Sequence, residues 1–273
     1  MKWFSKHKSA PVSGKSIIFQ SFRTHDVPEW MTLCMNTVRE WASFHGFDYR
    51  FVDDEFFNYA PEWFRIKAAE HLNLITDMAR LKLASELLAE GYEHAVWIDA
   101  DVLIMDKEGF QLPKQDPYYF CREMFLLGYN GELNIGKKVT NSICGFRQGN
   151  PLLDFLIHAG QEVVNKREGL GHAAIGTELL TGLNQHLPLP QIHDLILTSP
   201  LLLWGIDTRN ERILRYFSEQ VAVPVRAANL CAYFRNKQFN RLLVTDELFS
   251  RVCDALLARK GAVINHYLPA GSS

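Results

Sequence analysis

The chain lacks the sequence features that mark several common classes of protein. Its five cysteines are odd in number, and no two stand in a C-x-x-C pair, so the sequence predicts neither a disulfide framework nor a cysteine zinc site. We interpret them as reduced thiols of a cytoplasmic protein. Lys and Arg (29) nearly balance Asp and Glu (31), for a net charge of -2. Because nucleic-acid-binding proteins usually carry a basic excess, this balance argues against nucleic acid as a partner.

Long apolar runs are also missing. The longest uncharged apolar stretch, 195–206, is shorter than the roughly 20 residues of a bilayer-spanning helix, and it contains Pro200. Residues 1–14 carry lysines beside Trp3 and Phe4, without the apolar stretch of a signal peptide behind them. We predict a flexible basic segment there; the alternative is a weak contact with an anionic membrane surface. The protein is expected to be cytoplasmic, and at most peripheral at a membrane.

What the sequence does contain is an alternation of strand and helix patterns. Apolar strands are predicted at 16–20, 49–52 and 95–98, and the helical spacing of apolar residues predicts helices at 28–45 and 66–90. This β-α-β-α-β order predicts an α/β fold with a mostly parallel, Rossmann-like sheet flanked by helices. The last of these strands is apolar throughout and is expected to be buried on both faces.

The rest of the chain carries fewer helix and strand signals. Asn150 is expected to cap a helix that runs to Val164, another helix is expected at 173–186, and Thr245 is expected to cap the last one. Residues 106–150 are expected to be irregular and functional. Because no repeat or linker is visible, 15–273 is predicted to form a single domain.

Two aspartates follow the strand predicted at 95–98, in Trp97-Ile98-Asp99-Ala100-Asp101-Val102-Leu103. Side chains two positions apart in an extended chain point the same way, so Asp99 and Asp101 are expected to present paired carboxylates. A divalent cation would relieve their repulsion, and Mg²⁺ and Mn²⁺ prefer oxygen ligands and leave positions open for phosphate oxygens. Ligands of open α/β sheets bind beyond the carboxyl ends of strands. The pair therefore predicts a metal–phosphate site; the alternative is two acids that only cap a loop or helix.

Two segments together resemble a known group of enzymes. Asp77-Met78-Ala79-Arg80-Leu81, followed by the aspartate pair and its strand, is similar to the D-x-D glycosyltransferases that use nucleotide sugars, above all to glycosyltransferase families 8, 32 and 34. The resemblance implies a GT-A-type nucleotide-diphospho-sugar transferase fold, with 15–273 as the catalytic domain. It also implies Mn²⁺ or Mg²⁺ as cofactor and a UDP- or GDP-sugar as donor.

The resemblance assigns several residues to the donor site. In these families the aspartate at the Asp99 position contacts the donor ribose or the metal, and the one at the Asp101 position binds the metal directly. Asp77 and Arg80 would lie beside the donor, where a guanidinium suits a diphosphate; the alternative is an ion pair between the two, three residues apart on a helix. The end of the first strand resembles the site for the base and ribose, which implies three more donor-binding residues: Gln20, Phe22 and Arg23.

Three later stretches resemble further elements of these families. Ile264-Asn265-His266-Tyr267 resembles an H-Y element that supplies a third metal ligand, without the lysine or tryptophan that follows there; the alternative is a plain surface histidine. The stretch 174–181 resembles a helix start beside the transferred sugar, which implies a catalytic role for Glu178; the alternative is an ordinary first-turn glutamate. Asn141 begins a stretch, 141–146, that resembles a strand facing the transferred sugar and is assigned to donor binding.

The implied reaction transfers a sugar to a hydroxyl of a glycan, glycolipid or other acceptor, as in polysaccharide biosynthesis, and retention of configuration is implied by the families alone. A metal on Asp99, Asp101 and His266 would stabilise charge on the leaving diphosphate. One alternative is a non-catalytic protein that binds nucleotide sugars. Another is a haloacid-dehalogenase-type phosphatase, with Asp99 as nucleophile and 195–198 as its second motif.

Overall fold

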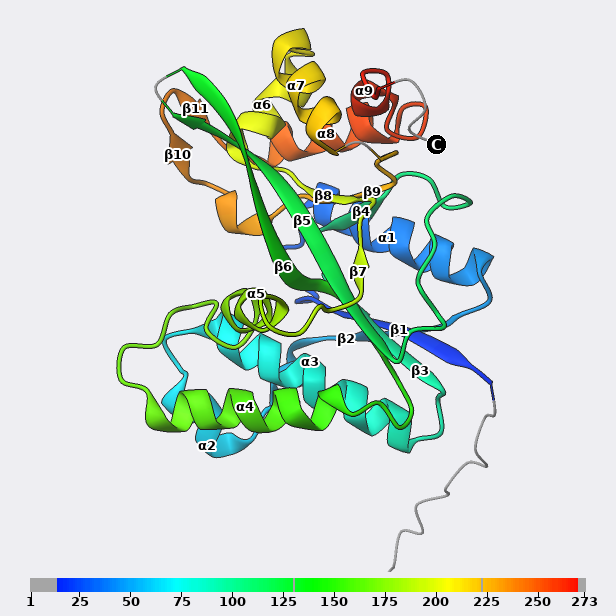
Figure 1. Ribbon diagram of the computed structural model, residues 1–273, viewed down its shortest axis with the longest axis vertical. Coiled ribbons are helices and arrows are strands. Elements are labelled where there is room, and N and C mark those ends of the chain that lie inside the picture. The colour runs from blue at the N-terminus through cyan, green and yellow to red at the C-terminus, as the bar shows by residue number, and fades with distance from the viewer. Residues whose placement is uncertain (1–13, 130, 222, 270–273) are drawn as a thin grey trace, which may run out of the picture.

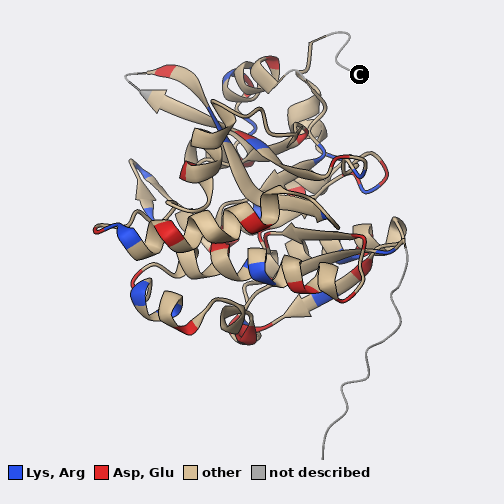
Figure 2. Cartoon of the chain, turned by 60° about the horizontal axis from the view of Figure 1, so that its bottom comes forward, with Lys and Arg blue, Asp and Glu red and all other residues tan. Residues whose placement is uncertain are grey.

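The computed structural model describes residues 14–129, 131–221 and 223–269. The basic segment predicted at 1–14, and the membrane contact predicted for it, lie outside this part of the chain except for Gly14. In the described residues no helix is both long enough and apolar enough to cross a bilayer. Acidic and basic residues are interspersed along the helices and loops seen in Figure 2.

A six-stranded sheet forms the centre of the molecule (Figure 1). Its strands are β1 (Ser16–Ser21), β2 (Asp48–Val52), β3 (His94–Ile98), β5 (Tyr118–Tyr129), β6 (Glu132–Arg147) and β7 (Gln191–Ile192). They lie in the order β2-β1-β3-β6-β5-β7. β1 pairs in parallel with β2 and β3, and β7 with β5, whereas β6 pairs antiparallel with β3 and β5. The sheet is therefore mixed, with its predicted parallel part at β2, β1 and β3.

Helices cover both faces of this sheet. Successive residues of a strand point to opposite sides, so the apolar strands present side chains to a helical layer on each face. In β1, Ile17 and Phe19 belong to the core under one helical layer, and Ile18 belongs to the core under the other. β3 is buried at every position, as its apolar sequence predicts. The first layer contains η1 (Asp54–Tyr59, a 3-10 helix), α2 (Glu62–Lys67), α3 (Leu72–Ala89), α4 (Leu152–Lys166) and α5 (Thr177–Asn184), and the second contains α1 (Glu29–Phe44).

A second, three-stranded sheet has its own core, to which α1 also contributes Trp30 and Cys34. Its strands are β4 (Val102–Ile104), β8 (Leu195–Leu197) and β9 (Ala227–Asn229), in the order β4-β9-β8. This part also contains α6 (Pro200–Asp207), α7 (Glu211–Val221), η2 (Ala232–Phe234), the hairpin of β10 (Gln238–Phe239) and β11 (Leu242–Leu243), α8 (Asp246–Leu257) and α9 (Ala262–Asn265). β3 continues into β4 through the Asp99–Asp101 turn, so the aspartates lie where the two sheets meet.

Most of the predicted elements and caps are confirmed. Asn150 Oδ1 accepts hydrogen bonds from the backbone N–H groups of Leu152 and Leu153 (3.1 and 2.9 Å), and Thr245 Oγ1 accepts one from Leu248 (3.3 Å). In place of the single helix predicted at 66–90 there are two helices: α2 ends at Lys67 and α3 begins at Leu72. Capping residues thus identify helix starts even where apolar spacing alone misplaces a boundary.

The prediction of an irregular stretch at 106–150 is wrong. β5 and β6 fill most of it and pair from Tyr118 to Phe146 as one long antiparallel hairpin. The residues between the two strands are Asn130-Gly131, a dipeptide typical of two-residue hairpin turns. The hairpin supplies the antiparallel part of the central sheet and one wall of the site described next.

Candidate active site

One large cleft, with a volume of about 1310 Å³, lies at the carboxyl ends of β1 and β3, where the two sheets meet. Its walls come from the loops after β1, β3 and β9, from α3, the start of α5 and α6, and from the β5–β6 and β10–β11 hairpins. This is the place at which open α/β sheets bind ligands. The predicted site residues that line it are Phe22, Arg23, Asp77, Arg80, Asp99, Asp101 and Asn141.

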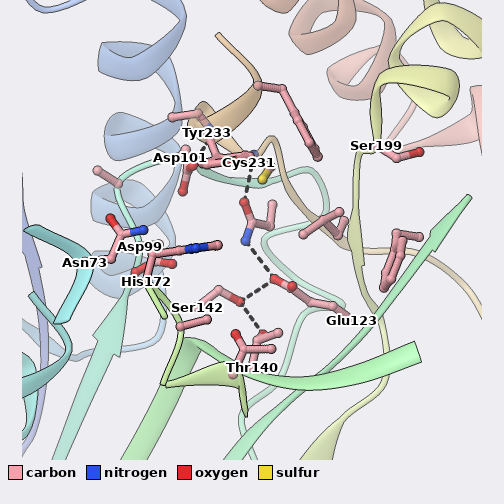
Figure 3. A pocket seen from close by; sticks show the side chains of 18 of the residues that line it. Asn73, Asp99, Asp101, Glu123, Thr140, Ser142, His172, Ser199, Cys231 and Tyr233 are labelled. Carbon is pink, nitrogen blue, oxygen red and sulfur yellow. Dashed lines mark hydrogen bonds between the residues drawn. The ribbon is translucent and has the colours of Figure 1, made fainter. Parts of the chain in front are cut away.

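Asp99 and Asp101 lie in a tight turn, so the prediction of an extended chain at the pair is wrong. The Val102 N–H donates to the Asp99 carbonyl oxygen (3.1 Å), as in a β-turn. Both carboxylates nevertheless border the same cleft (Figure 3). The Asp99 N–H donates to the Ser142 carbonyl (2.7 Å), and the Asp101 carbonyl accepts from the Leu230 N–H (2.9 Å). The turn is therefore held from both sides by neighbouring strands and loops.

Arg80 is the buried cation of the site. Its Nη1 lies 3.3 Å from Asp99 Oδ1 and donates to the Asn141 carbonyl (2.8 Å), and its Nη2 lies 3.4 Å from Asp77 Oδ1. The guanidinium also lies over the Trp97 ring, 4.8 Å from the centroid. The ion pair with Asp77 and the position beside Asp99 thus coexist in one geometry. Because all these partners fix the guanidinium, it forms a rigid positive charge behind the aspartate turn.

Segments that lie far apart in the sequence meet at Asp77. Asn141 Nδ2 donates to Asp77 Oδ1 (2.8 Å). Gly176, just before α5, approaches so closely that a Cβ there would lie 2.5 Å from Asp77 Oδ2, which leaves room only for glycine. Three stretches that separately resemble the glycosyltransferase families therefore lie around one corner of the cleft.

Burial and crowding control the protonation of the aspartate pair. Burial raises the pKa of Asp99, while Arg80 and the Trp97 indole N–H, which donates to Asp99 Oδ1 (2.5 Å), oppose the rise. Burial and the nearby Asp99 charge raise the pKa of Asp101 to about 7. The Ala232 N–H donates to Asp101 Oδ2 (2.7 Å) and limits that rise. The pair is therefore an environment that favours uptake of a proton or of a cation.

The donor atoms fit a hard divalent cation. The carboxylates of Asp77 and Asp99 share one buried cation, Arg80, and Asp101 adds a third carboxylate to the lining, which leaves surplus negative charge. Carboxylate oxygens are the ligands that Mg²⁺ and Mn²⁺ prefer. Within the described residues, no three His, Cys, Asp or Glu side chains come together as a metal-binding group. Asp99 and Asp101 are thus the candidate protein ligands. A bound ion would need phosphate oxygens and water to complete its coordination shell.

The predicted three-ligand metal set is not formed. His266 is exposed, just beyond the short helix α9, and does not border the cleft. The preceding Asn265 fixes this helix, since its Oδ1 accepts from the Val225 N–H (2.8 Å) and its Nδ2 donates to the Val225 carbonyl (2.9 Å). These bonds hold the H-Y element against the second core, so His266 keeps its alternative role of a surface histidine.

Two other predicted residues also lie outside the cleft lining. Glu178 is exposed in the first turn of α5, where its carboxylate lies beside Gly171, which agrees with the alternative of a first-turn glutamate. Gln20 is fully buried; its Nε2 donates to the Asp99 carbonyl (3.1 Å) and its Oε1 accepts from the Tyr49 hydroxyl (2.9 Å). Gln20 therefore supports the aspartate turn from behind and does not face the donor.

Glu123 borders the cleft and was not indicated by the sequence pattern. Its side chain is buried, and its Oε1 accepts hydrogen bonds from Ser142 Oγ and Asn229 Nδ2, both at 2.7 Å (Figure 3). Burial raises its pKa, and the hydrogen bond from Ser142 opposes the rise. Asn229 in turn accepts from the Cys231 N–H (2.8 Å), beside the amide that binds Asp101. The sequence feature that could have indicated Glu123 is an acid at a buried position of a strand. This feature can be recognised only once β5 is identified as a strand.

The loop before α5 and the 3-10 helix η2 after β9 meet at an aromatic pair in the cleft lining. The rings of His172 and Tyr233 are nearly parallel, with an angle of 5° and centroids 5.7 Å apart. The Lys237 ammonium lies over the Tyr233 ring, 3.0 Å from its centroid. Because these residues are far apart in sequence, this bridge across the cleft could be found only from the structure.

In the second motif of the phosphatase alternative, 195–198, Leu197 borders the cleft but the hydroxyl-bearing Thr198 does not. Thr198 is fully buried, and its Oγ1 donates to the backbone carbonyls of Asn229 and Leu230 (3.2 and 3.0 Å). A hydroxyl used in this way holds β8 beside the loop after β9. It is not placed to bind a phosphoryl group at Asp99.

Comparisons with known proteins give only distant structural likeness. No protein-family model and no curated sequence matches the chain. Similar solved structures include a glycosyltransferase involved in the glycosylation of the major capsid of PBCV-1, with TM-score 0.37, 11% identity, and coverage of 87% of this chain and 98% of that one. The PaToxG glycosyltransferase has TM-score 0.34, 14% identity, and coverage of 90% and 87%. The glycosyltransferase GlyE of Streptococcus pneumoniae TIGR4 has TM-score 0.39, 11% identity, and coverage of 95% and 66%. Likeness at these TM-scores establishes neither activity nor site, so function has to be inferred from the cleft itself.

Proposed function

We propose that the protein is a glycosyltransferase that moves a sugar from a UDP- or GDP-sugar to a hydroxyl-bearing acceptor, with Mn²⁺ or Mg²⁺ at Asp99 and Asp101. The observation that carries this proposal is the aspartate turn after β3, in which two crowded carboxylates and the guanidinium of Arg80 border one cleft. An excess of carboxylate oxygens over cations suits a metal-bound diphosphate. Such a cation, when bound, stabilises the charge that a diphosphate gains as it leaves.

The chain's own residues have separate tasks in this proposal. Arg80 fixes the orientation of the Asp99 carboxylate and opposes the rise of its pKa through their 3.3 Å contact. Asp77 holds the cleft wall together through Asn141 and its contact with Gly176. After β1, the Arg23 guanidinium lies 5.6 Å from the Phe22 ring centroid, and this flat pair would support the planar base of the donor.

Glu123 would act on the sugar end of the donor. It is the carboxylate that the β5–β6 hairpin contributes to the cleft lining, and two hydrogen bonds fix its position. A glycosyl cation develops positive charge at the transition state, and a fixed carboxylate stabilises that charge. Retention of configuration, as the resemblance implies, would agree with a substitution on the face of the departing phosphate.

Thermal unfolding with UDP, GDP and their sugars, each with and without Mn²⁺, tests the donor site. A ligand at a hundredfold excess over its Kd stabilises the folded state by about 2.7 kcal/mol. We expect a shift for one nucleotide class that requires Mn²⁺, and loss of this shift in Asp101→Ala. Asp48→Ala is the matched control, because Asp48 lies outside the cleft lining and pairs with Lys15 at the surface. An equal nucleotide shift in wild type and Asp101→Ala would remove the aspartate pair from the donor site.

Turnover separates transfer from mere binding. The wild-type protein with its donor should release the nucleoside diphosphate faster when an acceptor is added. Binding of a nucleotide sugar without any release would instead indicate the non-catalytic binding protein. Trapping of beryllium fluoride on Asp99, without nucleotide binding, would indicate the phosphatase.

A further inference from the structure

One end of the cleft is apolar, and the donor site described above does not explain it. Along β5 the residues that alternate toward the cleft change from acid to hydrocarbon, from Glu123 through Phe125 to Leu127. α6 and the β10–β11 hairpin add further apolar side chains to the same lining. We name this part the apolar arm, and it consists of Phe125, Leu127, Leu201, Trp204, Phe239 and Leu242.

The arm is exposed although its walls are fixed. Leu127 is 48% exposed and Trp204 38%. Ser199 Oγ donates to the Leu126 carbonyl (2.6 Å), which ties the start of α6 to β5. Leu201 packs over Gly128, where an added Cβ would lie 3.0 Å from its Cδ2. Large apolar side chains that stay open to solvent between fixed walls are typical of a binding surface and not of an incomplete core.

A glycine on the partner strand shapes the floor of the arm. Phe125 pairs with Gly136 across the hairpin, and a Cβ at Gly136 would come within 2.3 Å of the Phe125 ring. The ring therefore lies flat over the glycine, which leaves the space above the hairpin open. A flat aromatic floor with leucine and tryptophan beside it offers contacts to methylene groups.

Two basic side chains, Lys138 and Arg241, lie at the arm, and the neighbouring acid is the buried Glu123. Lys138 pairs with Glu123 in the β-ladder, its ammonium lies 5.3 Å from the Phe125 ring centroid, and Arg241 borders the cleft from the turn between β10 and β11. Among the described lining residues, α6 and the β10–β11 hairpin supply no acid, and neither Lys138 nor Arg241 forms an ion pair in that part of the chain. An anionic group next to a hydrocarbon chain matches this combination.

We propose that the apolar arm binds the hydrocarbon chain of the acceptor, and that the acceptor is an amphiphile whose anionic head group lies at Lys138 and Arg241. That the amphiphile is the acceptor rests on the proposed function. Its binding to the apolar arm does not depend on that function. A chain seated along Phe125 and Leu127 would run toward Glu123, since all three belong to the cleft-facing side of β5. The arm thus places the accepting group at the sugar end of the donor and selects a lipid-borne acceptor over a soluble glycan.

Calorimetric titration of the full chain with dodecyl phosphate, below its micelle concentration, tests the arm. We expect dodecyl phosphate to bind at least about tenfold more tightly than butyl phosphate, because each buried methylene contributes. Inorganic phosphate should not compete. Leu127→Glu should weaken dodecyl phosphate binding at least about tenfold, because it places a charge in the path of the chain. The matched control is Leu187→Glu, since Leu187 is 45% exposed but lies outside the cleft.

The head group is tested with the same tail. Lys138→Gln should weaken dodecyl phosphate and leave the affinity for uncharged dodecyl maltoside unchanged. The inference is overturned if wild-type protein does not bind dodecyl phosphate, or if Leu127→Glu and Leu187→Glu bind it equally. Nucleotide-induced thermal shifts of Leu127→Glu should equal those of wild type. Dodecyl phosphate binding that depends on Leu127, without nucleotide binding by the wild type, would refute the donor site and keep the arm.

Discussion

The imidazole of His94 is 3% exposed at the start of β3, and neither of its ring nitrogens has a hydrogen-bond partner among the described residues. Its ring packs edge-on against Tyr119, with centroids 5.5 Å apart. Burial, followed by the positive charges of Arg147 and Lys114, lowers its pKa from 6.5 to about 4. The folded protein therefore keeps His94 neutral at pH values at which the unfolded chain has already bound a proton.

This difference makes the free energy of unfolding depend on pH. Well above pH 6.5 the histidine is neutral in both states, so it adds no pH dependence to the free energy of unfolding. Below that value the unfolded state binds more protons, so stability falls by about 1.4 kcal/mol per pH unit until the folded pKa of about 4 is reached. The loss assigned to His94 is about 2 kcal/mol at pH 5 and about 3 kcal/mol below pH 4.

Urea unfolding of wild type and His94→Phe at pH 7 and pH 5 measures this loss. Phenylalanine keeps a flat ring against Tyr119 but cannot bind a proton. Other groups titrate in both proteins, so the informative quantity is the difference between the two pH-dependent changes. We expect wild type to lose about 2 kcal/mol more than His94→Phe between pH 7 and pH 5. Equal losses in the two proteins would refute the buried, neutral state of His94.

Three further predictions concern the cleft. Gly176→Ala should displace the Asp77 carboxylate and weaken donor binding at least about tenfold in a calorimetric titration. Gly182→Ala, within α5, where an added Cβ meets nothing within 4 Å, should bind the donor like wild type; equal affinities of the two variants would contradict the contact between Gly176 and Asp77. Arg80→Met should lower the free energy of unfolding by about 3 kcal/mol, because it leaves buried carboxylates unpaired. Adding Asp77→Asn should restore part of this free energy, measured by urea unfolding. An unchanged free energy of unfolding in Arg80→Met alone would contradict the pairing. Glu123→Ala should lower the free energy of unfolding by about 2 kcal/mol, because it leaves two buried hydrogen-bond donors without an acceptor. Glu123→Gln should unfold like wild type while its rate of nucleotide release falls. Equal stabilities of the two variants would contradict the hydrogen-bond network around Glu123.

Part of the fold could be predicted because its signals are local. The apolar run of β3, the spacing of apolar residues in α1 and the caps at Asn150 and Thr245 each depend on neighbours within a few residues. The division between α2 and α3 could not be predicted, because the helical spacing of apolar residues continues through the break. The hairpin of β5 and β6 carries a local turn signal at Asn130-Gly131, but the pairing of long strands across it is a non-local contact.

The candidate site divides in the same way. Asp77, Arg80, Asp99 and Asp101 could be proposed from a compact sequence pattern, and the structure places all of them at one cleft. His266 could not be placed from its H-Y pattern, because its position depends on how α9 is held against the second core.

By itself the sequence determined the strands β1, β2 and β3, the helix α1 and the acid pair that follows a buried strand, since these depend on residues close in the chain. Only the tertiary structure decided that the pair is a turn between two sheets, that Glu123 faces the same cleft, and that apolar side chains from three elements form one arm. These features arise from contacts between segments many residues apart. Such contacts are fixed by packing and register, which no local pattern specifies.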